Sequence, residues 1–219
     1  MSKNIYLKNN ISSSYFNKKV FLKDKKKINR IIDNIFISLD KKKDVFYTLS
    51  KKFNLSFNYS QFEKFNKYKS VILIGMGGSI LGAEALYSFF KDKIKKNFIF
   101  FDNLDQQEIE KIKKNSNLKD NLFIIISKSG NTLETLINSN LFKDKINHKN
   151  TIIITEKKPN ILNTFAKNKK ILLVTHKDYI GGRYSVLSEV GMLPAYFMGL
   201  NMTYFRKNLL NFFRSKEKS

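Results

Sequence analysis

The sequence predicts an α/β fold in which a parallel β-sheet lies between layers of helices. Five short segments are almost continuously hydrophobic and rich in β-branched and aromatic residues, which is typical of strands buried on both faces. Helix-like segments alternate with them, as right-handed crossovers between parallel strands require. Most glycines lie close to the ends of these strand-like segments, and open α/β sheets bind ligands at the carboxyl edge. A ligand site is therefore expected there.

Residues 1–68 are predicted to form an N-terminal helical region that is rich in lysine. Within 28–39, isoleucine, phenylalanine and leucine recur at the spacing of one helix face, and residues 45–53 repeat the pattern in a second helix. Ser60 and Glu63 have the spacing of a capping box for a short third helix. We expect the apolar faces of these helices to pack against the rest of the protein.

Residues 69–200 are predicted to form the sheet-containing domain, and residues 201–219 a C-terminal helix and tail. The five strand-like segments are residues 71–75, 98–102, 122–127, 151–155 and 171–175. The predicted crossover helices are residues 79–91, 106–114, 131–144 and 160–168. Pro194 is expected to kink the long helical stretch after the last strand, or to begin a new helix there.

The composition excludes several kinds of protein. The chain has 219 residues and no cysteine, so disulfides, thiolate catalysis and cysteine-based zinc sites are ruled out. Its hydrophobic content of 42% is that of a packed globular protein rather than a disordered one. The first residues are interrupted by polar side chains and lack the apolar segment that export requires. We therefore expect a cytoplasmic protein with no membrane partner.

The net charge of +23 raises the question of a nucleic-acid partner. Lysine is abundant along the whole chain together with asparagine, isoleucine and phenylalanine, all of which have A/T-rich codons. A base-composition bias explains this pattern without selection for binding. The lysines are also scattered rather than grouped with aromatic residues, so we expect no specific nucleic-acid partner.

The first glycine-rich loop, Gly75–Ser79, follows the first predicted strand. Glycines let a ligand approach the backbone, but several ligands use such loops. A dinucleotide fingerprint would need glycine where Ile80 stands, although Asp102 occupies the place of its ribose-binding acid. The mononucleotide P-loop pattern is absent. A purely structural turn remains the alternative for this loop taken alone.

The second loop, residues 127–135, combines hydroxyl groups with a predicted helix start. Its hydroxyls belong to Ser127, Ser129 and Thr132. Lys128 lies among them, and Asn131 with Glu134 has the spacing of an N-terminal capping pair. Hydroxyls, free backbone N–H groups and the positive end of a helix dipole together bind phosphate. A merely well-capped helix is the alternative, but it does not explain the cluster of hydroxyls.

The third loop carries Arg183 directly after Gly181 and Gly182. A guanidinium at the ligand-binding edge of a sheet can stabilise negative charge that develops on a substrate oxygen. An isolated arginine would more readily form a surface salt bridge. The position of Arg183 in a third glycine loop at the same edge favours the functional interpretation.

Taken together, the three loops resemble the glucose-6-phosphate isomerase family. Gly75–Ser79 matches the family's Gly-x-Gly-Gly-Ser loop, and residues 127–135 match its Ser-Lys-Ser/Thr-x-x-Thr-x-Glu-Thr loop. Residues 181–194 match its Gly-Gly-Arg-Tyr/Phe-Ser segment and the Ser-x-Val-Gly-x-x-Pro stretch that follows. The resemblance covers about residues 70–200. It implies a sugar isomerase (SIS) domain, which is a three-layer αβα arrangement around a five-stranded parallel sheet.

The resemblance also implies an activity and a phosphate site. The family interconverts glucose 6-phosphate and fructose 6-phosphate through a cis-enediol, a step of glycolysis and gluconeogenesis, and no cofactor or metal is expected. By resemblance, Ser127, Ser129 and Thr132 hold the 6-phosphate, and Lys128 contributes backbone and charge.

The remaining site residues are assigned to the sugar end by the same resemblance. Gly78 and Ser79 are expected to line the sugar, and Gly182 and Arg183 to lie near its O1 and C2 atoms. Arg183 is the expected catalytic residue, because it would stabilise the enediolate. Glu134 is expected to support the site from behind these residues, although helix capping explains it nearly as well.

The chain departs from the family pattern in one important respect. Family members have a second SIS domain with the general base, a ring-opening histidine and a late lysine, and no match to these is present. Glu84 and Glu189 are local carboxylates but do not occupy the base position. His176 lies at the ligand-binding edge and is a further candidate, whereas His148 is expected on the surface.

We therefore expect the N-terminal portion of a longer, homodimeric isomerase that binds sugar phosphate weakly and catalyses nothing by itself. Proton abstraction needs a positioned base, which contributes about a hundredfold to ten-thousandfold in rate. Two alternatives stay open. One is a stand-alone SIS domain that regulates by binding a phosphosugar, and the other is an isomerase acting on a different sugar phosphate.

Overall fold

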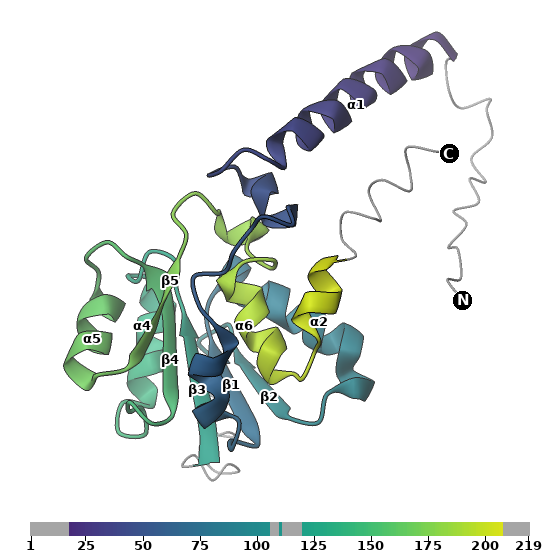
Figure 1. Cartoon of the computed structure of the whole chain (residues 1–219). Coiled ribbons are helices and arrows are strands. Elements are labelled where there is room, and N and C mark those ends of the chain that lie inside the picture. Colours follow the sequence, from purple (N-terminus) through teal and green to yellow (C-terminus); the bar gives the residue numbers. More distant parts are fainter. Residues whose placement is uncertain (1–17, 106–109, 111–119, 208–219) are drawn as a thin grey trace.

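The computed structural model describes residues 18–105, 110 and 120–207. Five parallel strands form one sheet in the order β2-β1-β3-β4-β5 (Figure 1). The strands are β1 (Ser70–Ile74), β2 (Asn97–Phe101), β3 (Asn121–Ile126), β4 (Thr151–Glu156) and β5 (Leu172–His176). Every strand begins and ends within one residue of its predicted position. The predicted α/β fold with a five-stranded parallel sheet is confirmed.

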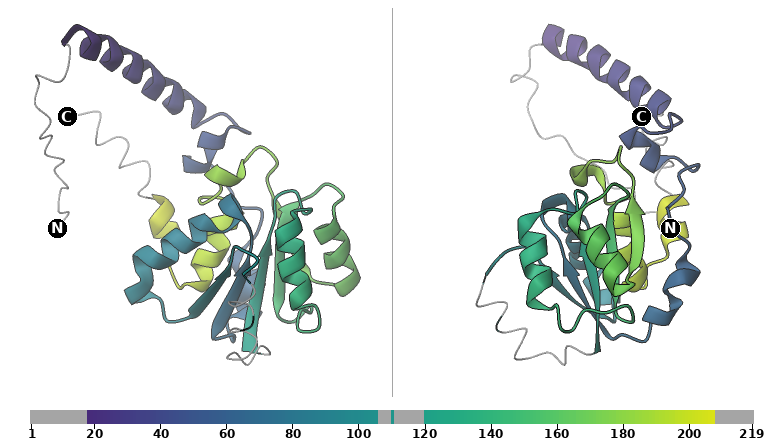
Figure 2. Two further views of the ribbon diagram at one scale, coloured as in Figure 1. Left: turned by 180° about the vertical axis from the view of Figure 1, so that it is seen from behind. Right: turned by 90° about the vertical axis from the view of Figure 1, so that its left-hand side faces the viewer.

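Helices cover both faces of the sheet and give the three predicted layers (Figure 2). One face is covered by α2 (Leu81–Phe90) and α6 (Glu189–Phe197), which pack against each other. The other face is covered by α4 (Leu133–Leu141) and α5 (Ile161–Lys169). The predicted crossover helix 106–114 lies outside the described residues, apart from residue 110.

Alternation along each strand divides the core between the two faces. In β1, Val71 and Leu73 belong to the cluster under α2 and α6, whereas Ile72 and Ile74 belong to the cluster under α4 and α5. All four side chains are fully buried. Strands buried on both faces have no need of polar residues at alternate positions, which explains why these segments read as continuous apolar runs.

The register of the strands brings the carboxyl ends of β1, β3 and β5 to one edge. Ile74 at the end of β1 pairs with Ile125 of β3, and Glu156 at the end of β4 pairs with His176 at the end of β5. The loops that follow β1, β3 and β5 therefore meet at the same edge of the sheet. These are the three loops that the sequence selected.

From Lys18 onward, the N-terminal region contains helices, but it differs from the prediction in its packing. Helix α1 (Lys18–Ser38) projects away from the sheet domain in every view (Figures 1 and 2). Its apolar stripe is largely exposed, with Ile28 53%, Ile31 49% and Ile32 40% exposed. The expectation that this stripe packs against the rest of the chain is wrong for these residues, because no other described element covers the helix there.

The two following helical segments are short 3₁₀ helices, Val45–Leu49 and Tyr59–Phe65. The predicted capping box from Ser60 is wrong, because Ser60 already lies inside the second of them. Its cap is Asn58, whose side-chain oxygen accepts a hydrogen bond from the backbone N–H of Ser60.

Pro194 lies inside α6 rather than at a helix start, so it neither ends the helix nor begins another.

Among the described residues, no helix combines the length and the apolar character needed to cross a lipid bilayer.

Candidate functional site

The three hydroxyls of the second loop lie together, as the sequence predicted. The Ser127 and Thr132 oxygens are 2.9 Å apart, and the Ser129 oxygen lies 3.5 Å from the first and 3.4 Å from the second. Ser127 and Ser129 also accept hydrogen bonds from the backbone N–H groups of Gly130 and Asn131. Because each hydroxyl can rotate, the cluster can direct several O–H donors at one anion.

Helix α4 begins directly after this cluster without a side-chain cap. Its N-cap residue is Thr132, whose side chain makes no capping hydrogen bond, so the first N–H groups of the helix lack a side-chain acceptor among the described residues. Uncapped N–H groups and the helix dipole favour an anion at this point. The predicted Asn131–Glu134 capping pair is wrong, since the side-chain oxygen of Asn131 instead accepts from the backbone N–H of Ile161 in α5.

Gly130 shows why this loop needs glycine. Its φ of +69° lies in the left-handed region, and an added Cβ would lie 2.1 Å from the side chain of Asn160. Asn160 is 8% exposed and caps α5 by accepting a hydrogen bond from the N–H of Asn163 at 2.8 Å. The second loop therefore rests on the start of α5, which fixes the positions of its hydroxyls.

The ammonium of Lys128 is not free in the loop, because it contacts Asp178 and Glu156. Its Nζ donates to the backbone oxygen of Asp178 at 2.7 Å and lies 3.4 Å from a Glu156 carboxylate oxygen. Burial by itself would raise the pKa of Glu156, but Lys158 at 2.6 Å and Lys128 outweigh it, so the net pKa lies below the usual value. The charge of Lys128 is thus shared with a carboxylate that stays ionised at neutral pH.

The first and third loops touch through their backbones. A Cβ at Gly78 would lie 2.2 Å from the carbonyl carbon of Gly182 and 2.7 Å from the backbone nitrogen of Arg183. The Ser185 hydroxyl lies 2.9 Å from the Gly78 carbonyl oxygen and 2.6 Å from that of Gly182, so it can donate to either. Gly78, which was predicted to line the sugar, is therefore a neighbour of Gly182, which was predicted to lie near the O1 and C2 atoms. Ser79 follows Gly78 in the same short 3₁₀ turn.

Arg183 is exposed and makes no hydrogen bond or ion pair with the described residues. Its backbone forms part of the 3₁₀ turn Gly182–Tyr184, which places it at the carboxyl edge of the sheet, where the other two loops also lie. A guanidinium without an internal partner is available to a ligand. The position of this side chain is set by the loop rather than by contacts of its own.

The local carboxylates do not supply an obvious base. Glu84 and Glu134 are half-buried in the first turns of α2 and α4, and the Glu134 side chain has no partner among the described residues. Glu189 is fully buried, and its Oε1 atom accepts hydrogen bonds from Lys177 and from the backbone of Ser56. The support expected from Glu134 is therefore not visible as a direct bond.

His176 ends β5 and is 2% exposed, whereas His148 is exposed, as expected. The Nδ1 atom of His176 lies 2.8 Å from the backbone oxygen of Lys177, which makes Nδ1 the protonated nitrogen of the neutral ring. Burial lowers the pKa of His176 below its usual 6.5, since a buried imidazolium would lose its hydration. The ring is therefore neutral at neutral pH and faces the protein rather than a ligand.

This burial predicts a dependence of stability on pH. The unfolded chain takes up a proton on His176 at a higher pH than the folded chain, so the free energy of unfolding should fall between about pH 7 and about pH 5. The contribution is fully present above the unfolded pKa and is lost as the pH falls through the folded one. Glu156 remains ionised in this range because its pKa is lowered.

Urea unfolding of the wild type and of His176→Asn at both pH values measures the effect. The His176→Asn variant should have a flatter pH dependence, and His148→Asn, at the exposed histidine, should leave the dependence as in the wild type. An unaltered slope in His176→Asn would show that other groups carry it.

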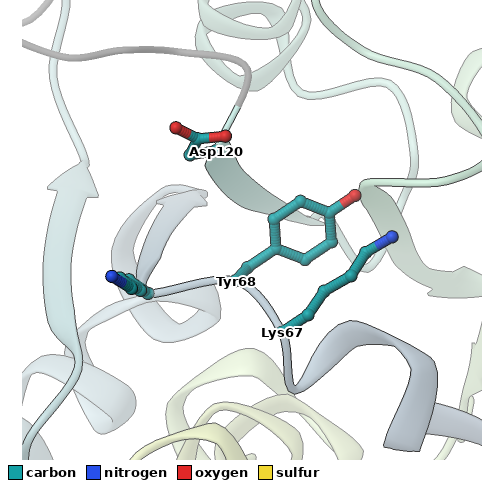
Figure 3. A pocket seen from close by; sticks show the side chains of 4 residues that line it. Lys67, Tyr68 and Asp120 are labelled. Atoms are coloured by element: carbon teal, nitrogen blue, oxygen red, sulfur yellow. The ribbon is translucent and has the colours of Figure 1, made fainter.

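A cavity of about 520 Å³ lies at the other end of the sheet (Figure 3). It is lined by Lys67, Tyr68, Lys69 and Asp120. Lys69 immediately precedes β1 and Asp120 immediately precedes β3, so this cavity is at the amino edge of the strands. It is separate from the three loops.

Two features of the site escaped the sequence analysis. Ser185 bridges the first and third loops, and its only signal was its place as the last residue of the Gly-Gly-Arg-Tyr-Ser segment. The contact of Lys177 with Glu189 joins residues that are twelve positions apart and had no local signal.

Comparison with known proteins agrees with the geometry. A sequence model of the phosphoglucose isomerase family matches residues 20–211. The glucose-6-phosphate isomerase of Methanocaldococcus jannaschii is 35% identical over 151 residues, which is 67% of this chain and 37% of that protein. That of Campylobacter jejuni is 33% identical over 187 residues, which is 79% of this chain and 44% of that protein.

Solved structures show the same fold. A hypothetical protein from Thermus thermophilus superposes with a TM-score of 0.68 at 20% identity, covering 87% of this chain and 48% of that one. A glucose-6-phosphate isomerase from Chlamydia trachomatis gives a TM-score of 0.54 at 25% identity, covering 63% of this chain and 29% of that one. The chain spans less than half the length of each of the relatives named here. Since the family match extends over most of the sequence, the chain belongs to the phosphoglucose isomerase family.

Proposed function

We propose that this chain provides the phosphate-binding and enediolate-stabilising part of a glucose-6-phosphate isomerase. The observation that carries the proposal is the convergence of three hydroxyls at the uncapped start of α4. Hydroxyl donors, backbone N–H groups and the helix dipole together suit a phosphate dianion. The relatives that match this chain are named glucose-6-phosphate isomerases, which supports glucose 6-phosphate and fructose 6-phosphate as substrates.

In the proposed reaction, Ser127, Ser129 and Thr132 hold the phosphate and thereby place the sugar along the same edge. Gly78 and Gly182 form the floor under the reacting carbons, beside Ser79. Arg183 stabilises the negative charge that develops on oxygen as the C2 proton is removed. Lys128 acts mainly through its backbone, because its ammonium is engaged with Glu156 and Asp178.

The base that moves the proton is proposed to come from outside the described residues. Glu156 and Glu189 are held by lysines, and a base that is already neutralised by an ion pair is a poor proton acceptor. Purified chain should therefore bind glucose 6-phosphate without turning it over, and measurable isomerisation would refute this part. We further propose that the complete enzyme is cytoplasmic and homodimeric. Light scattering of that enzyme would test the homodimer.

Removing two hydroxyls tests the phosphate site. The variant Ser129→Ala/Thr132→Val should bind inorganic phosphate and glucose 6-phosphate at least about tenfold more weakly, since hydrogen bonds to charged groups contribute about 1.5–3 kcal/mol each. Calorimetric titration measures both affinities.

The control is Ser88→Ala, which removes an exposed hydroxyl from α2 and should bind as the wild type does. Unchanged phosphate affinity in the double variant would overturn the proposal. If the high net charge alone bound anions, the affinity would depend steeply on salt and not on these hydroxyls.

A further inference from the structure

The loop that carries Arg183 is closed at its base by an ion pair. Lys177 directly follows β5 and Glu189 is the first residue of α6, so the pair joins the two ends of residues 178–188. The Lys177 Nζ lies 2.5 Å from Oε1 of Glu189. The Lys177 side chain is 21% exposed and the Glu189 side chain 0% exposed.

Both partners are held by further contacts. The ammonium of Lys177 lies 4.8 Å from the centre of the Phe53 ring, and Oε1 of Glu189 also accepts from the backbone N–H of Ser56 at 2.8 Å. The Ser56 hydroxyl in turn donates to the backbone oxygen of Thr175 in β5 at 2.7 Å. The base of the loop is therefore fastened to the sheet and to the N-terminal segment at one point.

Burying this ion pair costs desolvation free energy that an apolar contact between α6 and the sheet would not. The other eight residues of the helix are apolar or aromatic, and the Oε2 atom of Glu189 is buried without a hydrogen-bond partner in the described part of the chain. Replacing buried ion pairs by apolar residues is often neutral or stabilising, so stability alone does not account for such a group. What the pair does provide is a defined geometry.

Arg183 is the residue for which that geometry matters. Its side chain has no partner among the described residues, so its position depends on the backbone of residues 178–188. Near the tip, Ser185 fastens this backbone to Gly78. At the base, Lys177 and Glu189 fix the separation of the two ends.

We propose that Lys177 and Glu189 are positioning residues that set the distance between the Arg183 guanidinium and a ligand bound at the Ser127–Thr132 cluster. The proposal rests on the proposed function, because it assumes that Arg183 faces the reacting end of a sugar phosphate. It assigns Lys177 and Glu189 no direct contact with that ligand.

The test compares two ligands of the full 219-residue chain. Inorganic phosphate probes the hydroxyl cluster alone. A five-carbon aldonohydroxamate with a terminal phosphate also presents an anionic, enediolate-like end to Arg183. The variant Lys177→Met/Glu189→Gln keeps an acceptor for the Ser56 N–H. It should bind the hydroxamate about tenfold more weakly, because the hydrogen bonds between the Arg183 guanidinium and the anionic end of the ligand are weakened. Inorganic phosphate should bind within about twofold of the wild type, because its own hydrogen-bonding groups are unchanged.

Further variants separate positioning from a general structural role. In an Arg183→Ala background, the same double substitution should cause no additional loss, because the residue being positioned is absent. Lys177→Arg, with Glu189 unchanged, keeps the positive charge of the pair and should bind the hydroxamate as the wild type does. Lys52→Met removes a lysine charge from an exposed pair with Asp40 and controls for net charge. If the double variant does not fold, Glu189→Gln alone serves the same comparison.

The outcomes distinguish this proposal from the function on which it rests. If the wild type prefers the hydroxamate through Arg183 and the double variant keeps that preference, only the positioning role fails. Equal weakening of both ligands, or an undiminished effect in the Arg183→Ala background, also overturns it. A wild type that binds both ligands alike contradicts the proposed function, and the positioning role fails with it.

Discussion

Replacing Lys177 by methionine is expected to lower the free energy of unfolding by about 3–5 kcal/mol, because it leaves a buried carboxylate without its counter-charge. Glu189 is fully buried. Within residues 18–105, 110 and 120–207, its Oε2 atom has no partner, and the backbone N–H of Ser56 is the one donor that would remain bonded to Oε1. Burying an unpaired charge is among the few mechanisms by which one substitution causes so large a loss. Equilibrium unfolding in urea at neutral pH measures it.

Adding Glu189→Gln to Lys177→Met should recover most of this loss, since the charge that lacks a partner is then gone. The matched control is Lys52→Met, because Lys52 and Asp40 form an ion pair whose side chains are 72% and 69% exposed. That control should change the free energy of unfolding by less than about 1 kcal/mol. Equal losses for Lys177→Met and Lys52→Met would mean that burial does not make the first pair special.

The second large effect is expected for Gly78→Ala. The added Cβ would lie 2.2 Å and 2.3 Å from the carbonyl carbon and oxygen of Gly182, and backbone atoms cannot rotate away as a side-chain end can. The first and third loops must then separate, at a cost of about 1–3 kcal/mol in stability. Misplacing catalytic groups by about 1 Å can cost about a hundredfold in rate, so the phosphorylated hydroxamate should bind much more weakly.

Gly181→Ala is the matched control for this substitution. It makes the same chemical change in the third loop, but its Cβ would meet nothing closer than the Tyr184 ring at 3.5 Å. We expect stability and inorganic phosphate affinity close to those of the wild type. Wild-type hydroxamate affinity in Gly78→Ala would show that the contact between the loops does not position the site.

The parts of the structure that could be predicted from the sequence are those set by local pattern. The strands were placed to within one residue because strands covered on both faces must be apolar at every position. The hydroxyl cluster could be predicted because Ser127, Ser129 and Thr132 lie within six residues of one another. The edge at which the loops meet followed from the parallel sheet, whose carboxyl ends share one side.

Apart from the capping box at Ser60, the errors arose where the partner of a residue is distant in the chain. Asn131 has the spacing of a helix cap, but its side-chain oxygen accepts a hydrogen bond from the backbone N–H of Ile161, thirty residues further on. The pattern around Ile31 predicts an amphipathic helix, and the helix is present, but pattern cannot tell what covers its apolar face. The pairing of Lys177 with Glu189 could not be predicted either, because the packing of α6 on the sheet is what brings the two side chains together.

The nine glycines of the chain are not all required for the same reason. Most of them either have a positive φ or would press a Cβ into a neighbour, as Gly130 and Gly78 do. Gly181 and Gly182 have neither property, for a Cβ at Gly182 would meet only the Cα of Gly78 at 3.8 Å. Folding would tolerate a methyl group on this dipeptide. The absence of side chains on the two residues before Arg183 thus suits the close approach of a molecule that reaches the arginine from solvent.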